Sequence, residues 1–304
     1  MDSMTVKKGR SGREKKQNAF TVTLLVFLII YTVSLLGVLA WGLMTSFKGA
    51  IDFMDHPYQF PEKFVNNISL VFRKFKLPNT IDASGTGSRT VELSEMFLNS
   101  ILYALGSSFA ATIIPCVTAY ACARFQFKFS KVIYTTVIVA MIIPTVGNLP
   151  SELQMVVNLG LYNKVYGLWL LKANFLGMYF LVFFGVFAAF PVSFTEAAKI
   201  DGANNLTIML KIAFPLVINV MSTVLLINFI NFWNDYQTPL LYMPAYPTVA
   251  YGLFKLNMGA VDGDIANVPA KLAASLLVVV PTLILFVIFQ NKLLGSLTVG
   301  GVKG

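Results

Sequence analysis

Charged residues are scarce in this sequence. Lys, Arg, Asp and Glu make up only 12% of its 304 residues, whereas hydrophobic residues make up 56%. A soluble globular domain carries about 25% charged residues, and a disordered chain is poor in hydrophobic ones. The composition therefore excludes both classes and indicates a membrane protein.

Histidine and cysteine are almost absent. The single histidine, His56, excludes His-based triads and metal sites built from several histidines. Two cysteines exclude a disulfide scaffold, and we interpret Cys116 and Cys122 as small apolar packing residues of one membrane helix. The sequence also lacks the G-x-x-x-x-G-K-S/T loop that binds nucleotide phosphates. We therefore expect no enzyme, no metal site and no cofactor bound by this chain.

Six apolar stretches are long enough to cross the ~30 Å hydrocarbon core of a bilayer as helices. They are Phe20–Ser46, Met96–Ala123, Val132–Leu149, Val165–Phe190, Pro215–Tyr242 and Leu272–Gln290. The first is too long for the apolar core of a cleaved signal peptide, so we expect a retained anchor. The predicted fold class is an all-α integral membrane protein with a basic tail (1–19), a six-helix domain (20–290) and a C-terminal tail (291–304).

The positive charge predicts the orientation of these helices. An even number of spans places both termini on one side. That side holds 13 of the 23 basic residues but only four acids: Lys7, Lys8, Arg10, Arg13, Lys15, Lys16, Arg124, Lys128, Lys131, Lys199, Lys211, Lys292 and Lys303, against Asp2, Glu14, Glu196 and Asp201. Because cytoplasmic loops carry the excess of Lys and Arg, we expect both termini in the cytoplasm. The net charge of +9 then reflects topology and does not indicate nucleic-acid binding.

The loops are too short for an independent domain. The longest, 47–95, is read as a polar outer loop with one short helix, Pro61–Phe75, in which Pro61 suits the first helical position. No alternation of polar and apolar residues indicates a strand. The amphipathic segment Pro150–Lys164 is expected to lie as a short helix along the outer interface.

One cytoplasmic loop, 191–214, stands out as two short helices around a break. Ser193 or Thr195 can cap the first helix, and Gly202 supplies a conformationally permissive turn. The apolar residues of the second helix continue up to Pro215, which is expected to open the next span. Such an element would be a rigid knob on the cytoplasmic surface.

These residues resemble the EAA loop of binding-protein-dependent ABC transporter permeases, in the carbohydrate branch and its MalG-type subunit. The matching segments are Glu196-Ala197-Ala198, Asp201-Gly202-Ala203, Pro215, Asn99-Ser100, Ala119-Tyr-Ala-Cys-Ala-Arg124-Phe125, Leu159-Gly-Leu-Tyr-Asn163 and Gly300-Gly301-Val302-Lys303-Gly304. The resemblance extends from about Phe20 to Gly304. Two residues depart from it: Cys122 replaces the more usual Leu, and Lys172 is a polar residue early in the fourth span.

The resemblance implies an ATP-driven sugar importer in the cell membrane of a bacterium. Its EAA loop would be the coupling helix, seated in a cleft of a cytoplasmic ATPase, and the tail from Gly300 to Gly304 would reach toward the same partner. The other partners implied are a second homologous permease, two ATPase copies that bind ATP and Mg²⁺, and an extracytoplasmic sugar-binding protein. Without the resemblance, the loop reads as a solvated connection, and the tail as a frayed terminus.

Polar residues in the outer half of the fifth span are candidates for the substrate pathway. They are Asn228, Asn231, Trp233, Asn234, Asp235 and Tyr236. Asn228, Asn231 and Asp235 share one helical stripe, which should avoid lipid. The same amides could instead hold helices together, and the Trp and Tyr could form an interfacial belt. Both interpretations stay open. Lys172 and Asp235 lie close enough to an interface for a structural role.

A second class of function also remains, namely a facilitator or channel that needs no ATPase. The segment from Glu196 to Pro215 distinguishes the two classes, because a facilitator has no reason to carry it. The importer could also carry an amino acid or another polar solute, since the sugar depends on the resemblance and not on pocket chemistry.

Overall fold

The computed structural model describes residues 5–82, 85–125, 127, 129–144, 147–261 and 263–298, with side chains described between residues 19 and 290. The chain divides into two compact units. The first contains Met1–Arg73 and Asn267–Ala273, and the second contains Lys74–Ala266 and Ala274–Gly304.

Three helices and the start of a fourth belong to the first unit. They are α1 (Thr5–Thr45), α2 (Ala50–Asp55), α3 (Asn67–Lys74) and the beginning of α14 (Val268–Thr298). The apolar part of α1, Ala19–Thr45, is long enough to span a membrane and agrees with the first predicted span. Its end is tied to the following loop because the Asn67 Nδ2 group donates to the carbonyls of Ser46 (3.0 Å) and Lys48 (2.7 Å).

The short helix of the outer loop begins six residues later than predicted. It is α3, and Pro61 lies before it in irregular chain. The start is set by Asn66, whose side-chain oxygen accepts a hydrogen bond from the Ser69 backbone N–H at 2.9 Å. This side-chain bond caps the helix at Asn66, so the prediction of a helix from Pro61 was wrong.

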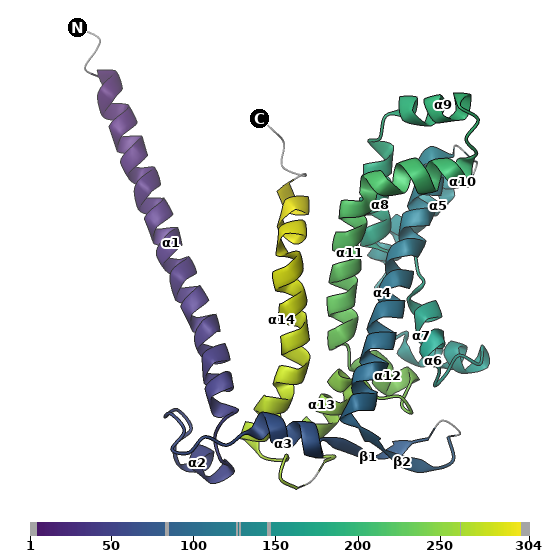
Figure 1. The fold of residues 1–304 in the computed structure, drawn as a ribbon. Coiled ribbons are helices and arrows are strands. Elements are labelled where there is room, and N and C mark those ends of the chain that lie inside the picture. The colour runs from purple at the N-terminus through teal and green to yellow at the C-terminus, as the bar shows by residue number, and fades with distance from the viewer. Residues whose placement is uncertain are drawn as a thin grey trace. The chain divides into compact units, whose positions relative to one another are not determined.

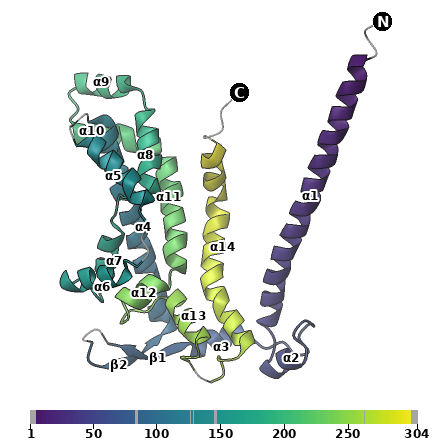
Figure 2. The same cartoon turned by 180° about the vertical axis from the view of Figure 1, so that it is seen from behind.

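The second unit contains a hairpin and ten short or long helical elements before α14. They are β1 (Lys76–Ile81), β2 (Ser88–Glu92), α4 (Leu93–Arg124), α5 (Ser130–Ile142), α6 (Leu149–Asn158), α7 (Val165–Lys172), α8 (Met178–Ala188), α9 (Val192–Ile200), α10 (Asn205–Ile208) with the π-turn Met209–Ala213, α11 (Phe214–Asn234), α12 (Gln237–Tyr242) and α13 (Val249–Asn257). Helix α4 packs against α7, α8 and α11 (Figures 1 and 2).

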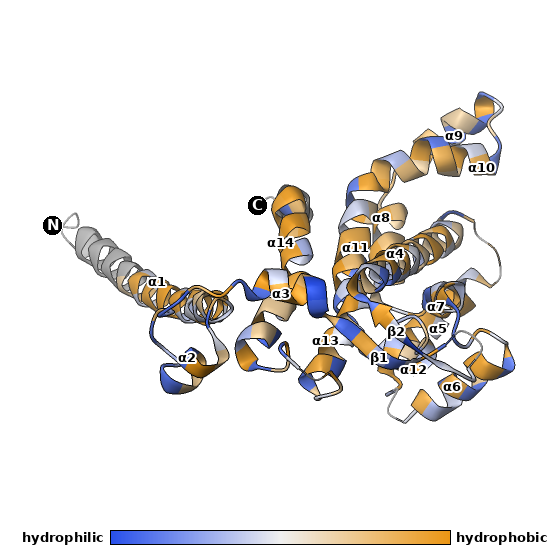
Figure 3. Cartoon of the chain, turned by 60° about the horizontal axis from the view of Figure 1, so that its bottom comes forward, coloured by the Kyte–Doolittle hydropathy of each residue, from blue (hydrophilic) through white to orange (hydrophobic). Residues whose placement is uncertain are grey.

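The two ends of this second unit differ. Helices α9 and α10 lie at one end, and the hairpin lies at the other with α12 and α13 (Figure 1). Between them, α4 and α11 are mostly hydrophobic, whereas part of β1 is hydrophilic (Figure 3). Buried aromatic side chains of α8, Phe183 and Phe187, fill the core beside Tyr120 of α4 and Val217 of α11.

The hairpin was not predicted. Strands β1 and β2 pair antiparallel, with Lys76 opposite Glu92 and Ile81 opposite Ser88. The register shifts between Leu77 and Thr80, which are the two buried residues of β1. Because this irregularity places buried residues three apart instead of two, the strand shows no alternating pattern in the sequence.

Four helices are long and apolar enough to cross a membrane, and the bent pair α8 and α9 makes a possible fifth, within the described part of the chain. The third expected span, Val132–Leu149, was too long: α5 ends at Ile142 because Ile143 precedes Pro144 and takes an extended conformation. The fourth, Val165–Phe190, is interrupted between α7 and α8, and the fifth ends at Asn234 instead of Tyr242. Segment Pro150–Lys164 does contain the expected helix, α6.

Candidate functional site

A sharp bend separates α8 from α9, the first helix of the loop 191–214. Helices α8 and α9 meet at 68° across Ala189–Pro191. Phe190 precedes Pro191, and a residue before proline is disfavoured in helical conformation. Pro191 itself occupies the N-cap of α9, which has no side-chain cap. The predicted caps were therefore wrong, because Ser193 and Thr195 lie inside α9.

The turn that ends α9 is a complete Schellman motif. Gly202 has φ +79°, its N–H donates to the Lys199 carbonyl (3.0 Å), and the Ala203 N–H donates to the Ala198 carbonyl (2.9 Å). These are the two hydrogen bonds that satisfy the last carbonyls of a helix through a residue in left-handed conformation. A Cβ on Gly202 would meet open space, so only the backbone angle requires glycine. The predicted permissive turn is thus present at Gly202.

The second helix of the loop runs directly into the next span. Asn204 caps α10 by accepting a hydrogen bond from the Thr207 N–H at 2.8 Å. A π-turn, Met209–Ala213, then joins α10 to α11, and the Phe214 N–H donates to the Met209 carbonyl. Proline clashes with the carbonyl four residues earlier in a regular helix, and the wider turn precedes Pro215. Pro215 lies in the first turn of α11, as expected, although the helical stretch Asn205–Asn234 is continuous through the π-turn.

The α9–α10 element exposes apolar side chains. Ile200 is 86% exposed and Leu206 is 60% exposed. Ala197 is also exposed, whereas Ala198 is the only buried residue of α9. None of the ion pairs among the described residues involves Glu196 or Asp201, and both are exposed. Ile200 and Leu206 therefore lie uncovered beside exposed charged residues of the same element.

The polar residues predicted to share one stripe of α11 fall into two groups, one bonded to neighbouring helices and one exposed. Asn228 is buried, and its Nδ2 group donates to Thr112 Oγ1 of α4 at 3.2 Å. Asp235 accepts from the Tyr103 hydroxyl of α4 (2.8 Å) and from the Thr238 backbone N–H (3.0 Å). These two side chains hold helices together in this structure. Lys172 lies beside them, with its Nζ atom 3.3 Å from Thr238 Oγ1.

Asn231 and Asn234 point to the other, exposed side of α11. Asn219 and Thr223 extend the same side toward α10, since positions 219, 223, 227, 231 and 234 follow helical spacing. Asn219 is exposed and Thr223 is partly buried. The sequence analysis missed these two residues because it considered only the outer half of the span. A search for amides at four-residue intervals along the whole span would have found Asn219.

The two aromatic candidates occupy different surroundings. Trp233 is buried, and its Nε1 group donates to the Val278 carbonyl of α14 at 3.0 Å. Tyr236 is 40% exposed and stacks on Phe254 of α13, with ring centroids 4.4 Å apart. Gly300 to Gly304, expected to contact a partner, lie outside the described residues.

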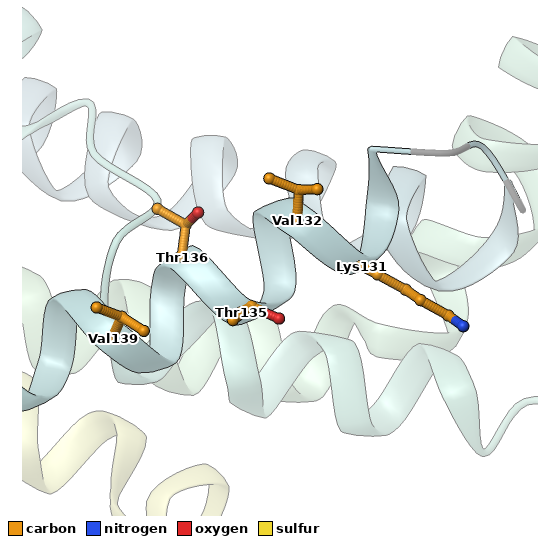
Figure 4. Close-up of a pocket in the computed structure, with 5 residues that line it drawn as sticks. All are labelled: Lys131, Val132, Thr135, Thr136 and Val139. Carbon is orange, nitrogen blue, oxygen red and sulfur yellow. The ribbon is translucent and has the colours of Figure 1, made fainter.

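Metal clusters and surface hollows are two further kinds of candidate site. No cluster of three or more His, Cys, Asp or Glu side chains occurs in the part of the chain that the structure describes. A hollow on α5 is lined by Lys131, Val132, Thr135, Thr136 and Val139, all from one helix. These side chains fan out from the helix instead of converging (Figure 4). This hollow is an uncovered helix face.

These features define a polytopic helical membrane protein that presents a bent, exposed helix pair at one end of its membrane domain. Residues 111–294, which include that pair, match the family "Binding-protein-dependent transport system inner membrane component", and the chain belongs to this family. It is therefore a multi-pass protein of the cell membrane. The family expected from the EAA-like segment is confirmed.

The relatives are transport permeases from bacteria. The chain is 30% identical to the multiple sugar-binding transport system permease protein MsmG of Streptococcus mutans, covering 96% of this chain and 99% of that protein. It is 28% identical to the melibiose/raffinose/stachyose import permease MelC of Bacillus subtilis over 70% and 77% of the two chains. A crystal structure of a bacterial ABC transporter that imports alginate shares the fold, with a TM-score of 0.73 at 19% identity, covering 91% of this chain and 97% of that one.

Proposed function

We propose that this chain is a permease subunit of an ATP-driven importer of oligosaccharides and forms half of the translocation pathway. The observation that carries the proposal is the exposed α9–α10 element within a chain of the binding-protein-dependent family. Relatives named for the transport of sugars support the carbohydrate cargo. A second homologous permease would supply the other half of the pathway.

The membrane topology in this proposal has six spans. Helix α5 would be a fifth span beside α1, α4, α11 and α14; at 13 residues it extends about 20 Å, so the chain after Ile142 must complete the crossing. Helices α7 and α8 together form one interrupted span. Irregular backbone at membrane depth is tolerated where protein or a water-filled cavity surrounds it. Six spans place both termini in the cytoplasm, on the side of α9.

The α9–α10 element is the coupling helix in this proposal. Its exposed apolar residues would enter a cleft of a cytoplasmic ATPase, and Glu196 and Asp201 could pair with basic residues there. The Schellman turn and the Asn204 cap keep the element rigid, so a push from the ATPase would move α8 and α11. The residues assigned to coupling are Glu196, Ala197, Ala198, Asp201, Gly202, Ala203 and Pro215, with the tail Gly300–Gly304 as a second contact.

ATP and Mg²⁺ would be bound by two copies of the ATPase, and this chain would bind no cofactor. An extracytoplasmic sugar-binding protein would deliver the cargo at the hairpin end. A solved alginate ABC transporter in complex with a pentasaccharide-bound periplasmic protein has the same fold, with a TM-score of 0.62 over 95% of this chain and 98% of that one, which supports such a partner.

The exposed side of α11 is the part of the pathway we assign to this chain. Amide side chains at membrane depth avoid lipid, and they form hydrogen bonds with sugar hydroxyls. Asn231 and Asn234 are therefore assigned to the pathway together with Asn219, while Tyr236 would offer an aromatic face at its outer end. Asn228, Trp233 and Asp235 would hold α11 in place beside the pathway through their hydrogen bonds to neighbouring helices.

Affinity purification from native membranes in mild detergent tests the proposal. We expect an ATPase and a second permease to copurify. Addition of the sugar-binding protein with melibiose, raffinose or stachyose, the sugars named for the relative MelC, should stimulate ATP hydrolysis for at least one sugar. A chain that purifies alone, or as a homo-oligomer without ATPase activity, would instead support an ATP-independent facilitator.

Substitution of Asn231 by Leu tests the pathway assignment. The variant should assemble normally but show altered uptake, because one exposed hydrogen-bonding group is lost. Ile227→Leu is the matched control, since it lies on the same side of α11 without an amide. A reduced yield of assembled complex for Asn231→Leu alone would show that the amide joins subunits.

A further inference from the structure

The last turn of α4 holds the bend between α8 and α9 through one side chain. The Arg124 Nη2 group donates a hydrogen bond to the Phe190 carbonyl at 2.7 Å. The guanidinium carbon also lies 4.8 Å from the centre of the Phe190 ring. Both contacts are directed at one residue, which is 66 positions away in the sequence.

Phe190 is the residue about which α9 turns. Proline follows it, so its carbonyl lies at the interruption between two helices, where a carbonyl lacks its usual helical partner. Its ring stacks on Phe194 in the first turn of α9, with centroids 5.2 Å apart and planes at 26°. A guanidinium suits this position because it is planar, stacks on aromatic rings and keeps its charge.

The rest of α9 is packed loosely against α4. A hollow separates them, lined on one side by the end of α4 and the residues after it, and on the other by Val192, Thr195, Glu196 and Lys199 of α9. Only Ala198 of α9 is buried. Arg124 therefore joins the end of α4 to Phe190, two residues before α9, and the hollow beside α9 leaves room for α9 to rotate about that residue.

We propose that Arg124 is a positioning residue that sets the angle of α9 and transmits its displacement to α4. Since α4 packs against α7, α8 and α11, a rotation of α9 about Phe190 would reach all three through this side chain. The inference depends on the proposed role of α9 as the coupling helix. It adds that the coupling has a second route, separate from the covalent connections of α9 to α8 and α11.

The conservative variant Arg124→Lys provides the main test. Lysine keeps the positive charge at the end of the helix but cannot both stack on Phe190 and donate from a planar group. In proteoliposomes with the ATPase and binding protein, we expect normal assembly and at least about a fivefold fall in sugar moved per ATP hydrolysed. Lys131→Arg on α5 is the control for an exchange of one basic side chain for the other, and it should leave this ratio unchanged.

A spectroscopic measurement on the permease itself separates the two proposals. Spin labels at Lys199→Cys on α9 and Leu216→Cys on α11, both exposed positions, should give a narrow distance distribution. We expect Arg124→Gln to broaden that distribution without a loss of folded protein. Cys116 and Cys122 are buried and should not be labelled.

The outcomes are distinguishable. If the wild-type complex moves sugar with ATP while Arg124→Lys retains the same ratio, or Arg124→Gln retains the same distance distribution, the role of Arg124 is refuted and the importer stands. If the wild-type chain shows no ATP-driven transport, the proposed function fails, even where the distance distribution changes.

Discussion

The two ends of the second unit are stabilised in different ways. At the hairpin end, side chains bond to backbone groups far along the chain: the Ser100 Oγ atom accepts from the Val249 N–H (2.8 Å), and the Asn99 Nδ2 group donates to the Pro247 carbonyl (3.1 Å). At the α9 end, the hydrogen bonds of the turn and cap join residues at most five apart. The hydrogen bond from Arg124 to the Phe190 carbonyl, which joins residues 66 positions apart, is the exception at this end.

This difference separates a fixed region from a movable one. Long-range bonds join α4 to Pro247 and to Val249 at the start of α13, so the hairpin end must keep its arrangement for those buried groups to stay paired. Local bonds give α9 and α10 a defined shape without fixing their position relative to α4 and α11. An element that transmits motion needs both properties, namely rigidity within itself and freedom as a whole.

Changes at Gly202 should produce the largest effect, confined to transport. Gly202→Val places a β-branched side chain at φ +79°, a genuine outlier for such a residue, so the turn should be lost and uptake should fall at least about tenfold if coupling is abolished. The added atoms meet open space, so the amount of membrane-inserted protein should not change. Uptake assays and immunoblots of membranes measure the two quantities.

Two further variants at the same position separate the turn from its surface. Asn and Asp both tolerate the left-handed conformation. Gly202→Asn should therefore retain most uptake. Gly202→Asp keeps the turn but adds a second carboxylate beside Asp201 on the proposed docking surface, and we expect a folded protein without uptake. Normal uptake by Gly202→Asp would argue against the coupling role of this surface.

At the fixed end, Ser100→Ala should lower stability without changing the coupling of transport to ATP. Its Oγ atom is the partner of the Val249 N–H, which would remain buried and unpaired. Such a loss costs about 1–3 kcal/mol. The melting temperature of the purified complex is the measurement. Ser108→Ala is the matched control, because Ser108 is equally buried in α4 but bonds only to Leu105 in its own helix.

A smaller loss is expected for Arg89→Lys in β2. The guanidinium binds Glu95 with two nitrogens, at 2.9 and 2.5 Å, and also donates to the Ala245 carbonyl at 2.9 Å. The hydrogen bond and charge of Glu95 raise the pKa of Arg89. Both side chains are about one-third exposed, so solvent limits the effect to about 1 kcal/mol or less. Limited proteolysis near the hairpin should detect it, and Lys76→Arg, which keeps its own ion pair, should behave as wild type.

The sequence predicted the elements whose cause is local. Long apolar runs marked α1, α4, α11 and α14, and Gly202 marked the turn after α9. The resemblance also singled out Asn99, Ser100 and Arg124, which make long-range side-chain bonds in the structure.

Features set by tertiary contacts were not predictable in this way. Asn228 and Asn231 have identical side chains and lie one helical turn apart, yet Asn228 bonds to Thr112 of α4 whereas Asn231 is exposed. Helical spacing places them on a common stripe, but only the positions of α4 and α8 decide which edge of that stripe is covered. The register shift in β1 likewise depends on its pairing with β2.

The smallest effect should be a pH dependence limited to the hairpin end. Hydrogen bonds from Lys76 and Lys74 lower the pKa of Glu92 and Asp264 below their ordinary values of 4.5 and 3.8. A carboxylate with a lowered pKa stabilises the folded state fully above its ordinary value, and that contribution is lost as the pH falls through the lowered one. Proteolysis near the hairpin should therefore increase slightly when the pH falls below about 4. The double variant Lys74→Gln, Lys76→Gln should not show this increase in proteolysis at low pH. If the increase persists in the variant, other groups cause it. The α9 end, which has no ion pair among its described residues, should show no such increase.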